Sequence, residues 1–509
     1  MSENRETVTG IRESGRVDID AFERRVREEA DGLKERLASG TFDNRQATIG
    51  LEYEFYAVES DGYRLRRVPR SLLECLGFER EIGLHNAELT SGVHPCSGAG
   101  LSALKLGTEA KIRSFQRRAS EADIRFVSDG MWTIGPATNT TEGYLTEATH
   151  EEGISLAINV SNAVRYHGFA SVDEHTPVAG TVALPGATIE ADTAGPVSLT
   201  ASIQPHVQPR RAADLPAYHN NALRVAGPVL AIAANSPFLP PDLYDDGALT
   251  RRLLLEDTHA ETRVPLYEGL MNPKRGDPKV RFPEDIDTAA EAVDRIAADA
   301  VIVPALIEGG ERFDDAFVHF RHKHGSYWRW VRPVFDGASA ADASARVEFR
   351  PLPGQPTLPD TIALVAAVAG LLTGLSVTDH PATDLPWAVA RENFYAAVED
   401  GLSADLEWVT ASGDRTSETD RLYEDLFDVA VAGLEARGLT ADEATARLRP
   451  LRDRVDAGIT PARWKREAVR RSLDAGASPG DAVRDAQRAY VREQGERFYD
   501  GSLVDWPAG

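Results

Sequence analysis

Hydrophobic and polar residues alternate over residues 48–57, which read TIGLEYEFYA. Side chains of a β-strand point to opposite faces with period two. Tyr53 and Phe55 would therefore face a core, while Glu52 and Glu54 would share the opposite face. Two like charges on one strand face repel each other unless water or a cation screens them. The stretch predicts a half-buried strand with an acidic polar face.

Similar polar faces recur at four later stretches of strand-like sequence. If these segments are neighbours in one sheet, a single face holds four carboxylates, a histidine, three amides and at least one arginine. The four stretches contain Asn86 and Glu88; Gln204, His206 and Gln208; Trp328, Trp330 and Arg332; and Glu348 and Arg350.

Such a density of acids indicates a metal site. Carboxylates brought close together raise one another's pKa, and a cation relieves the repulsion. Mg²⁺ takes oxygen ligands and binds through one or two carboxylates together with substrate phosphates. Arg350, two residues from Glu348, would suit a phosphoryl oxygen because a guanidinium group binds such oxygens through two N–H groups. The set fits ATP chemistry better than hydrolysis by a lone acid–base pair.

Each of these features also has an ordinary structural explanation. A single histidine such as His206 is more often a hydrogen-bonded side chain than a metal ligand. Glu348 and Arg350 could belong to cross-strand ion pairs, which at a surface are worth under about 1 kcal/mol. Trp328 and Trp330 are typical of a core or a pocket wall. The sequence contains no P-loop, dinucleotide-binding, HExxH or G-x-S-x-G motif.

Apolar residues three and four positions apart predict several helices. Strands and helices do not alternate as βαβ units do, so we expect an α+β fold with a mostly antiparallel sheet. Residues 1–16 are polar, and we expect them to be disordered. Thr460 and Pro461 predict the cap and first turn of a late helix. The predicted helices span residues 18–39, 101–122, 224–234, 285–307, 359–375 and 386–408, and the chain beyond a polar linker at 410–416 is expected to be all helical.

The composition is strongly acidic. There are 80 Asp and Glu residues against 56 Lys and Arg, a net charge of -24, and only seven lysines. In molar salt the Debye length is about 3 Å, so an acidic surface keeps a protein dissolved at little cost in self-repulsion. The charge indicates a halophilic source. It argues against a protein that coats nucleic acid, which needs a basic surface.

The sequence predicts a cytoplasmic protein without a membrane partner. Its N-terminus is polar and charged, unlike a signal peptide. The longest apolar run, residues 362–375, falls short of the roughly 20 residues that a membrane span needs. Cys75 and Cys96 form no CxxC pair and indicate no disulfide framework. The oligomeric state stays open.

Seven short motifs in order along the chain resemble the glutamate–cysteine ligase family. The branch that they resemble most is that of the prokaryotic carboxylate–amine ligases, which share a catalytic fold with glutamine synthetase. The resemblance covers roughly residues 45–405, and beyond about residue 410 the sequence shows no counterpart to the family core. The motifs are GLEYEF (50–55), NAELTS (86–91), GMW (130–132), SIQPHVQ (202–208), LRVAGPVLAIAANSPF (223–238), VRP (331–333) and VEFRPLPGQPT (347–357).

The resemblance implies a funnel-like antiparallel sheet that holds ATP and Mg²⁺. In such enzymes ATP phosphorylates the γ-carboxylate of glutamate, and the amino group of cysteine attacks the acyl phosphate. Glu348 and Arg350 match catalytic positions, with Arg350 stabilising charge on the transferred phosphoryl group. By the same matching, the metal ligands are Glu52, Glu54, Glu88, His206 and Glu348, and the nucleotide pocket is lined by Gln204, Arg332 and Arg350.

We therefore expect three segments: a polar N-terminus with an amphipathic helix (1–43), an ATP-dependent ligase catalytic domain (44–409) and a helical C-terminal extension (410–509). The amine acceptor is open: cysteine is the leading hypothesis, and a different amine is the alternative. A third hypothesis is a non-catalytic relative that binds a nucleotide or metabolite. The complete set of acids argues against it, because unpaired charges on a buried sheet face are costly.

Overall fold

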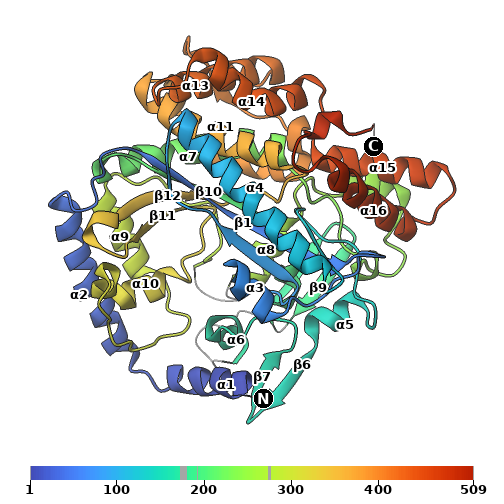
Figure 1. Cartoon of the computed structure of the whole chain (residues 1–509), viewed down its shortest axis with the longest axis horizontal. Coiled ribbons are helices and arrows are strands. Elements are labelled where there is room, and N and C mark those ends of the chain that lie inside the picture. Colours follow the sequence, from blue (N-terminus) through green and yellow to red (C-terminus); the bar gives the residue numbers. More distant parts are fainter. Residues whose placement is uncertain (1, 172–179, 192, 273–276, 508–509) are drawn as a thin grey trace.

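An antiparallel sheet lies at the centre of the protein, with long helices packed over one side of it (Figure 1). The structure is a computed structural model that describes residues 2–171, 180–191, 193–272 and 277–507. The fold is α+β with a curled sheet and C-terminal helices, as the sequence predicts.

Strand β1 (Thr48–Glu59) is the centre of an eight-stranded sheet. It pairs along one edge with β10 and then β5 and along the other with β4 and then β3, and every pairing is antiparallel. The main path runs β11-β12-β10-β1-β3-β2. The bounds are β2 (Glu79–Arg80), β3 (Asn86–Thr90), β4 (His94–Pro95), β5 (Ile124–Val127), β10 (Ile203–Gln208), β11 (Val331–Asp336) and β12 (Ser344–Phe349).

The two faces of this sheet differ as the alternation predicts. Leu51, Tyr53 and Phe55 are at most 1% exposed and lie in the main apolar core. Val347 and Phe349 on β12 are completely buried in the same core. The carboxylates that alternate with these residues therefore project from the opposite face.

The long helices that contribute to the main core include α4 (Gly98–Ser120), α7 (Leu215–Ala233), α11 (Leu358–Val377) and α12 (Trp387–Asp400). Helix α11 is long and apolar enough to cross a membrane, but 89% of its most apolar window is buried inside the protein. At 20 residues it is longer than the apolar run seen in the sequence, so its burial, rather than its length, marks it as a core helix.

The N-terminal expectation was wrong. Helix α1 (Ser2–Ser14) precedes helix α2 (Ile19–Ala38), where disorder was expected up to residue 16. Val8 and Ile11 are buried against Ile154 of a hairpin made by β6 (Ala148–Glu151) and β7 (Ile154–Ala157). A single apolar pair is too weak a periodic signal, and the helix depends on this distant hairpin for its contacts.

Two predicted helices are shorter than expected. The segment 285–307 forms only α9 (Ala289–Ala298), which begins where the Thr288 side chain accepts a hydrogen bond from the amide of Glu291. Helix α12 ends at Asp400 because Gly401 has a positive φ of 57°. The remaining elements of this region are α3 (Arg70–Leu76), α5 (Thr141–Thr146), α6 (Val164–Ser171), β8 (Gly180–Leu184), β9 (Ala187–Ala191), α8 (Arg263–Met271) and α10 (Val318–His324).

The C-terminal part is helical beyond a short hairpin, as expected. The Thr460 hydroxyl accepts from the amide of Arg463, which confirms the predicted cap. Leu426 and Leu448 join the main core, whereas Trp464 belongs to a separate apolar cluster. The division of the chain at residues 43 and 409 stays a prediction. The elements are β13 (Trp408–Val409), β14 (Arg415–Thr416), α13 (Thr419–Glu435), α14 (Ala441–Asp456), α15 (Pro461–Asp474) and α16 (Pro479–Arg497).

Three glycines allow α11 and α13 to touch backbone to backbone. A Cβ atom on Gly433 would lie 1.8 Å from the carbonyl oxygen of Gly370 and 2.5 Å from the amide nitrogen of Gly374. Any larger side chain at Gly433 must therefore push the two helices apart.

We expect Gly433→Ala to lower the free energy of unfolding by about 3 kcal/mol, the upper end of the cost of overpacking a core. Gly107→Ala is the matched control, because a Cβ there meets nothing within 4 Å in the middle of α4. That change should stabilise the protein by up to about 1 kcal/mol through helix propensity. Thermal and urea denaturation measure both effects, and equal effects of the two substitutions would contradict this view of the helix contact.

Candidate functional site

The polar face of the sheet brings together side chains from five strands. Strand β1 lies between the chain segments that carry the other acids, so the adjacency assumed from the sequence is confirmed. The residues that face one another across paired strands are Glu54 and Glu88, Glu52 and Gln204, His206 and Glu348, and Arg332 and Glu348.

Glu348 is held between two arginines. Its Oε2 accepts a hydrogen bond of 2.8 Å from Nε of Arg332, and its Oε1 pairs with Nη1 of Arg350. Burial alone would raise the pKa of Glu348, but Arg332, Arg350 and the nearby His206 outweigh it and hold the pKa well below its ordinary value. Glu348 is therefore a permanent anion that fixes two guanidinium groups. Each of its oxygens accepts from one arginine and keeps a second lone pair that a metal ion could use.

Gln204 links the arginine pair to the acids of β1. Its Oε1 accepts from Nη1 of Arg350 at 2.6 Å, and its Nε2 donates to Oε1 of Glu54 at 2.9 Å. Gln204 is only 2% exposed and lies behind the pocket, while Arg350 lines the pocket beside Glu54. The amide thus positions Arg350 relative to Glu54.

Glu54 is a buried carboxylate with a strongly shifted pKa. Besides Gln204, it accepts hydrogen bonds from the backbone amide and the hydroxyl of Ser202, at 2.7 and 2.9 Å. Burial and the negative charge of Glu81 nevertheless raise the pKa of Glu54 to about 7. The group is poised between its charged and neutral forms near neutral pH.

A third acid, Glu81, lies beside Glu54 and Glu88. One carboxylate oxygen from each of the three residues lies within 4.8 Å of the others, a spacing that suits a shared cation. Burial raises the pKa of Glu88 well above its ordinary value, and the charges of Glu52, Glu81 and Glu54 add to the effect. Oxygen ligands at this spacing are what Mg²⁺ prefers, so these residues fit a divalent metal ion.

His206 and Glu52 form the other end of the polar face. The Nε2 atom of His206 is buried and lies 3.2 Å from Oε1 of Glu52. The two atoms do not have the geometry of a hydrogen bond. Its Nδ1 accepts a 3.0 Å hydrogen bond from Arg346, which in turn binds both oxygens of Asp336. A neutral ring with this contact carries its proton on Nε2. Metal binding through Nε2 would need that proton to leave and Arg346 to release Nδ1.

Burial raises the pKa of Glu52, but the adjacent His206 and the positive charge of Arg350 outweigh burial and leave the pKa below its ordinary value. Glu52 therefore stays charged under conditions in which Glu54 and Glu88 are partly protonated. The two ends of the polar face differ in charge state because His206 and Arg350 together outweigh burial at Glu52, whereas burial and the charge of Glu81 dominate at Glu54.

Two pockets open on this face. The inner pocket contains Glu54, Glu81 and Arg350, and its walls include Arg263, Tyr267, Trp328, Arg329 and Trp330. The outer pocket has a volume of about 430 Å³ and contains Glu52 and His206. Its walls include Gly50, Ser91, Val93, Arg312, Ala338, Ala341 and Arg346.

The sequence analysis missed three residues of the site. Arg346 shares a strand face with Glu348 and Arg350, so the period-two rule would have found it. Glu81 lies before the alternating part of its segment and reaches the site through a turn, for which the sequence has no signal. Arg263 begins helix α8 and carries no motif of its own. Arg332 and Trp330 lie at the site, as the fifth polar stretch predicts.

Comparisons with known proteins agree with this geometry. The model of glutamate–cysteine ligase family 2 (GCS2) matches residues 48–496, which extends through α16 and corrects the expectation that the likeness ends near residue 405. No curated protein sequence matches the chain. A glutamate–cysteine ligase from Francisella tularensis, solved in complex with AMP, has a TM-score of 0.51 at 13% identity, over 92% of this chain and 91% of that one.

A bifunctional glutathione synthetase from Pasteurella multocida has a TM-score of 0.47 at 13% identity, over 92% of this chain and 54% of that one. The structural likenesses concern the fold, whereas the family match extends over most of the sequence and includes all of the strands that form the polar face. On this basis the chain is a ligase that belongs to glutamate–cysteine ligase family 2.

Proposed function

We propose that the chain uses ATP and Mg²⁺ to join the γ-carboxylate of glutamate to the amino group of cysteine. The observation that supports this most directly is the cluster of Glu54, Glu81 and Glu88, of which Glu54 and Glu81 line the inner pocket together with Arg350. Clustered acids next to a fixed guanidinium group suit a reaction in which a cation and a phosphoryl group meet.

Glu54, Glu81 and Glu88 are the residues that would hold Mg²⁺, and Glu52, His206 and Glu348 stay predicted as further ligands. The buried Nε2 of His206, which lacks a hydrogen-bond partner among the described residues, fits a role in such a set. When bound, Mg²⁺ would neutralise charge on the phosphate oxygens of ATP.

The two pockets differ in size and lining, and the inner one, at about 40 Å³, has to widen to admit an amino acid. The outer pocket, at about 430 Å³, is within the usual size range of ligand sites and combines apolar walls with Arg312 and Arg346, as a nucleotide requires. The inner pocket offers Arg263 and Arg329 to carboxylates and aromatic walls to aliphatic stems. We infer that ATP occupies the outer pocket and the amino acids the inner one.

Arg350 lies at the inner pocket, held by Glu348 and Gln204, and this fixed geometry lets it stabilise charge without reorganisation. Arg332 takes part through Glu348 rather than by contact with the nucleotide. An oxygen of the γ-carboxylate takes the terminal phosphoryl group of ATP and ADP leaves. The amine then attacks the carbonyl carbon, and phosphate leaves as the amide forms. We place this reaction in the cytoplasm, where ATP is available.

The identity of the amine is tested by ADP release from the purified protein in molar KCl with Mg²⁺, ATP and glutamate. Cysteine is compared with a panel of other amines, and the products are identified by mass spectrometry. We expect turnover with cysteine and a γ-glutamyl dipeptide. Turnover with another amine alone would overturn the cysteine assignment, and folded protein that binds ATP but never turns over would favour a binding function.

Glu88→Gln and Glu348→Gln should both abolish turnover while changing stability in opposite directions. Glu88→Gln removes one of several acids that repel one another. It should therefore raise the melting temperature of the protein when this is measured in the absence of Mg²⁺. Glu348→Gln leaves Arg332 and Arg350 without their buried anion, which costs about 3–5 kcal/mol. Thermal denaturation in chelator and ADP release measure the two effects. Full activity in either variant would contradict its assigned role.

The affinity for Mg²⁺ should rise as the pH increases through about 7. The pKa of Glu54 is raised in the folded protein from 4.5 to about 7, so protonated Glu54 stabilises the metal-free fold at low pH and this stabilisation is lost as the pH rises through about 7. Mg²⁺ binds the deprotonated form and displaces the proton. Calorimetry should show tighter binding at about pH 8 than at about pH 6, with proton release between these values.

Glu54→Gln is the control for this pH dependence, because an amide cannot titrate. Its weaker Mg²⁺ binding should vary less with pH. Identical affinity of the unaltered protein at both pH values would show that Glu54 does not take part in metal binding.

A further inference from the structure

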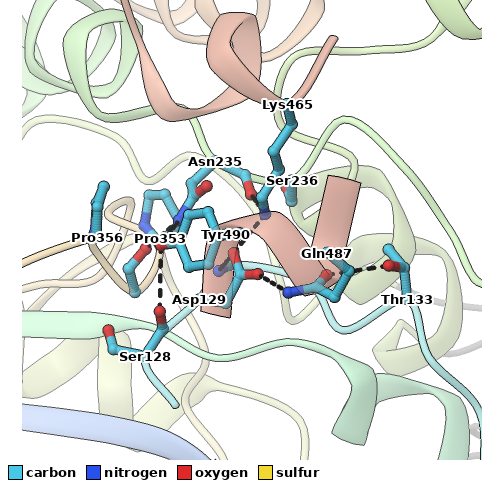
Figure 2. A network of polar contacts seen from close by, with 12 residues as sticks. Ser128, Asp129, Thr133, Asn235, Ser236, Pro353, Pro356, Lys465, Gln487 and Tyr490 are labelled. Carbon is cyan, nitrogen blue, oxygen red and sulfur yellow. Dashed lines mark hydrogen bonds and ion pairs between the residues drawn. The ribbon is translucent and has the colours of Figure 1, made fainter. Parts of the chain in front are cut away.

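A buried chain of charges connects the C-terminal helices to the inner pocket. It consists of Lys465, Asp129, Asn235, Glu261 and Arg263, each at most 6% exposed, and we call it the Lys465 relay. Figure 2 shows its first part, with Lys465 reaching down from its helix towards Asn235 and Asp129. The two cations and two carboxylates of the relay balance in charge.

The outer end of the relay is the ion pair between Lys465 of α15 and Asp129, which follows β5. The Nζ atom of Lys465 contacts Oδ1 of Asp129, donates to the carbonyl of Asn235 at 2.9 Å and lies 4.7 Å from the ring centre of Tyr490. The other Asp129 oxygen accepts from Nε2 of Gln487 at 2.7 Å (Figure 2). These three contacts fix the position of the Lys465 ammonium group.

The inner end of the relay reaches substrate space. The backbone amide of Asn235 donates to Oε2 of Glu261 at 2.9 Å, and Oε1 of Glu261 accepts from Nε of Arg263 at 2.9 Å. Arg263 donates through Nη2 to the carbonyl of Pro351 and lies 5.2 Å from the ring centre of Trp330. Among the residues that the structure describes, no group accepts from its Nη1, and the side chain lines the inner pocket.

A purely structural role would not require this arrangement. The chain has only seven lysines, yet Lys465 is placed in the interior, where an apolar residue of similar volume would pack without desolvation of a charge. The contacts of Lys465 converge on Asn235, whose own amide orients Glu261. Glu261 is fully buried, and its carboxylate is oriented by the Asn235 amide, the Ser236 side chain and Arg263.

We propose that Lys465 is a positioning residue for substrate binding, which acts through Asn235 and Glu261 to hold the guanidinium group of Arg263 in the inner pocket. The proposal rests on the function proposed above, in which Arg263 faces the carboxylate of an amino-acid substrate. The C-terminal helices thereby contribute to the affinity for the amino acid without touching it.

The test uses a variant that removes both charges of the outer pair, Asp129→Asn with Lys465→Met, so that no buried charge is left unpaired. We expect the KM for glutamate to rise about tenfold through loss of a fixed carboxylate contact. The KM for ATP should stay within about twofold, because the relay does not reach the outer pocket. Calorimetric titration of glutamate into the protein with ADP and Mg²⁺ should show the same loss of affinity.

The matched control is the neutral pair Asp360→Asn with Arg454→Met. Asp360 and Arg454 are fully buried and 3.0 Å apart, and they also link a C-terminal helix to the core, but neither contacts Glu261 or Arg263. This control should lower the melting temperature as the test variant does and leave the KM for glutamate unchanged. If the KM for glutamate rose in both variants, the cause would be general destabilisation, and the proposal would be overturned.

Combination with Arg263→Met distinguishes positioning from an independent effect. If Lys465 acts through Arg263, the triple variant should bind glutamate no more weakly than Arg263→Met alone, whereas independent effects would multiply. Normal glutamate affinity in the variant that lacks the outer pair would overturn the positioning role and leave the proposed function intact. Failure of the unaltered protein to bind glutamate or turn over would overturn the proposed function and this inference with it.

Discussion

Carboxylates that share a buried sheet face repel one another, and the site is organised around the ways in which this repulsion is relieved. On the β12 side of the sheet, Arg332 and Arg350 compensate Glu348. On the β3 side, Glu54 and Glu88 face each other across paired strands with Glu81 beside them. No guanidinium group forms an ion pair with these three acids among the described residues, and bound cations or protons would relieve the repulsion that the hydrogen bonds to Glu54 leave.

The alternation of residues along β1 was enough to predict the two faces of the central strand. Because the side-chain period of a strand is exact, the same rule placed Glu88, His206 and Glu348 on polar faces of their own strands. Their adjacency could not be derived in this way, since strand order depends on contacts between residues far apart in the sequence. It was an assumption that the sequence left open, and the sheet confirms it.

The errors have physical causes that the local pattern does not contain. Helix α1 depends on apolar contacts with a hairpin about 140 residues later. Helix α9 ends at Ala298, although the buried apolar residues Ile302 and Val303 follow it. Glu81 and Arg263 enter the site from a turn and from the start of a helix, outside any periodic stretch. The side chains of turns and helix ends are positioned by tertiary packing, and the periodicity of the sequence does not predict their positions.

The contacts of the C-terminal helices also bear on how the protein is made. Asp129 and its partner Lys465 are 336 residues apart, and α16 supplies Gln487 and Gln494 to the same loop. The ribosome synthesises a chain from its N-terminus at about 5–20 residues per second. Asp129 is therefore made well before its partner Lys465. The sheet can form early, but the loop behind it cannot close over an unpaired carboxylate. The ion pair behind the inner pocket is thus completed only when synthesis of the chain is nearly finished.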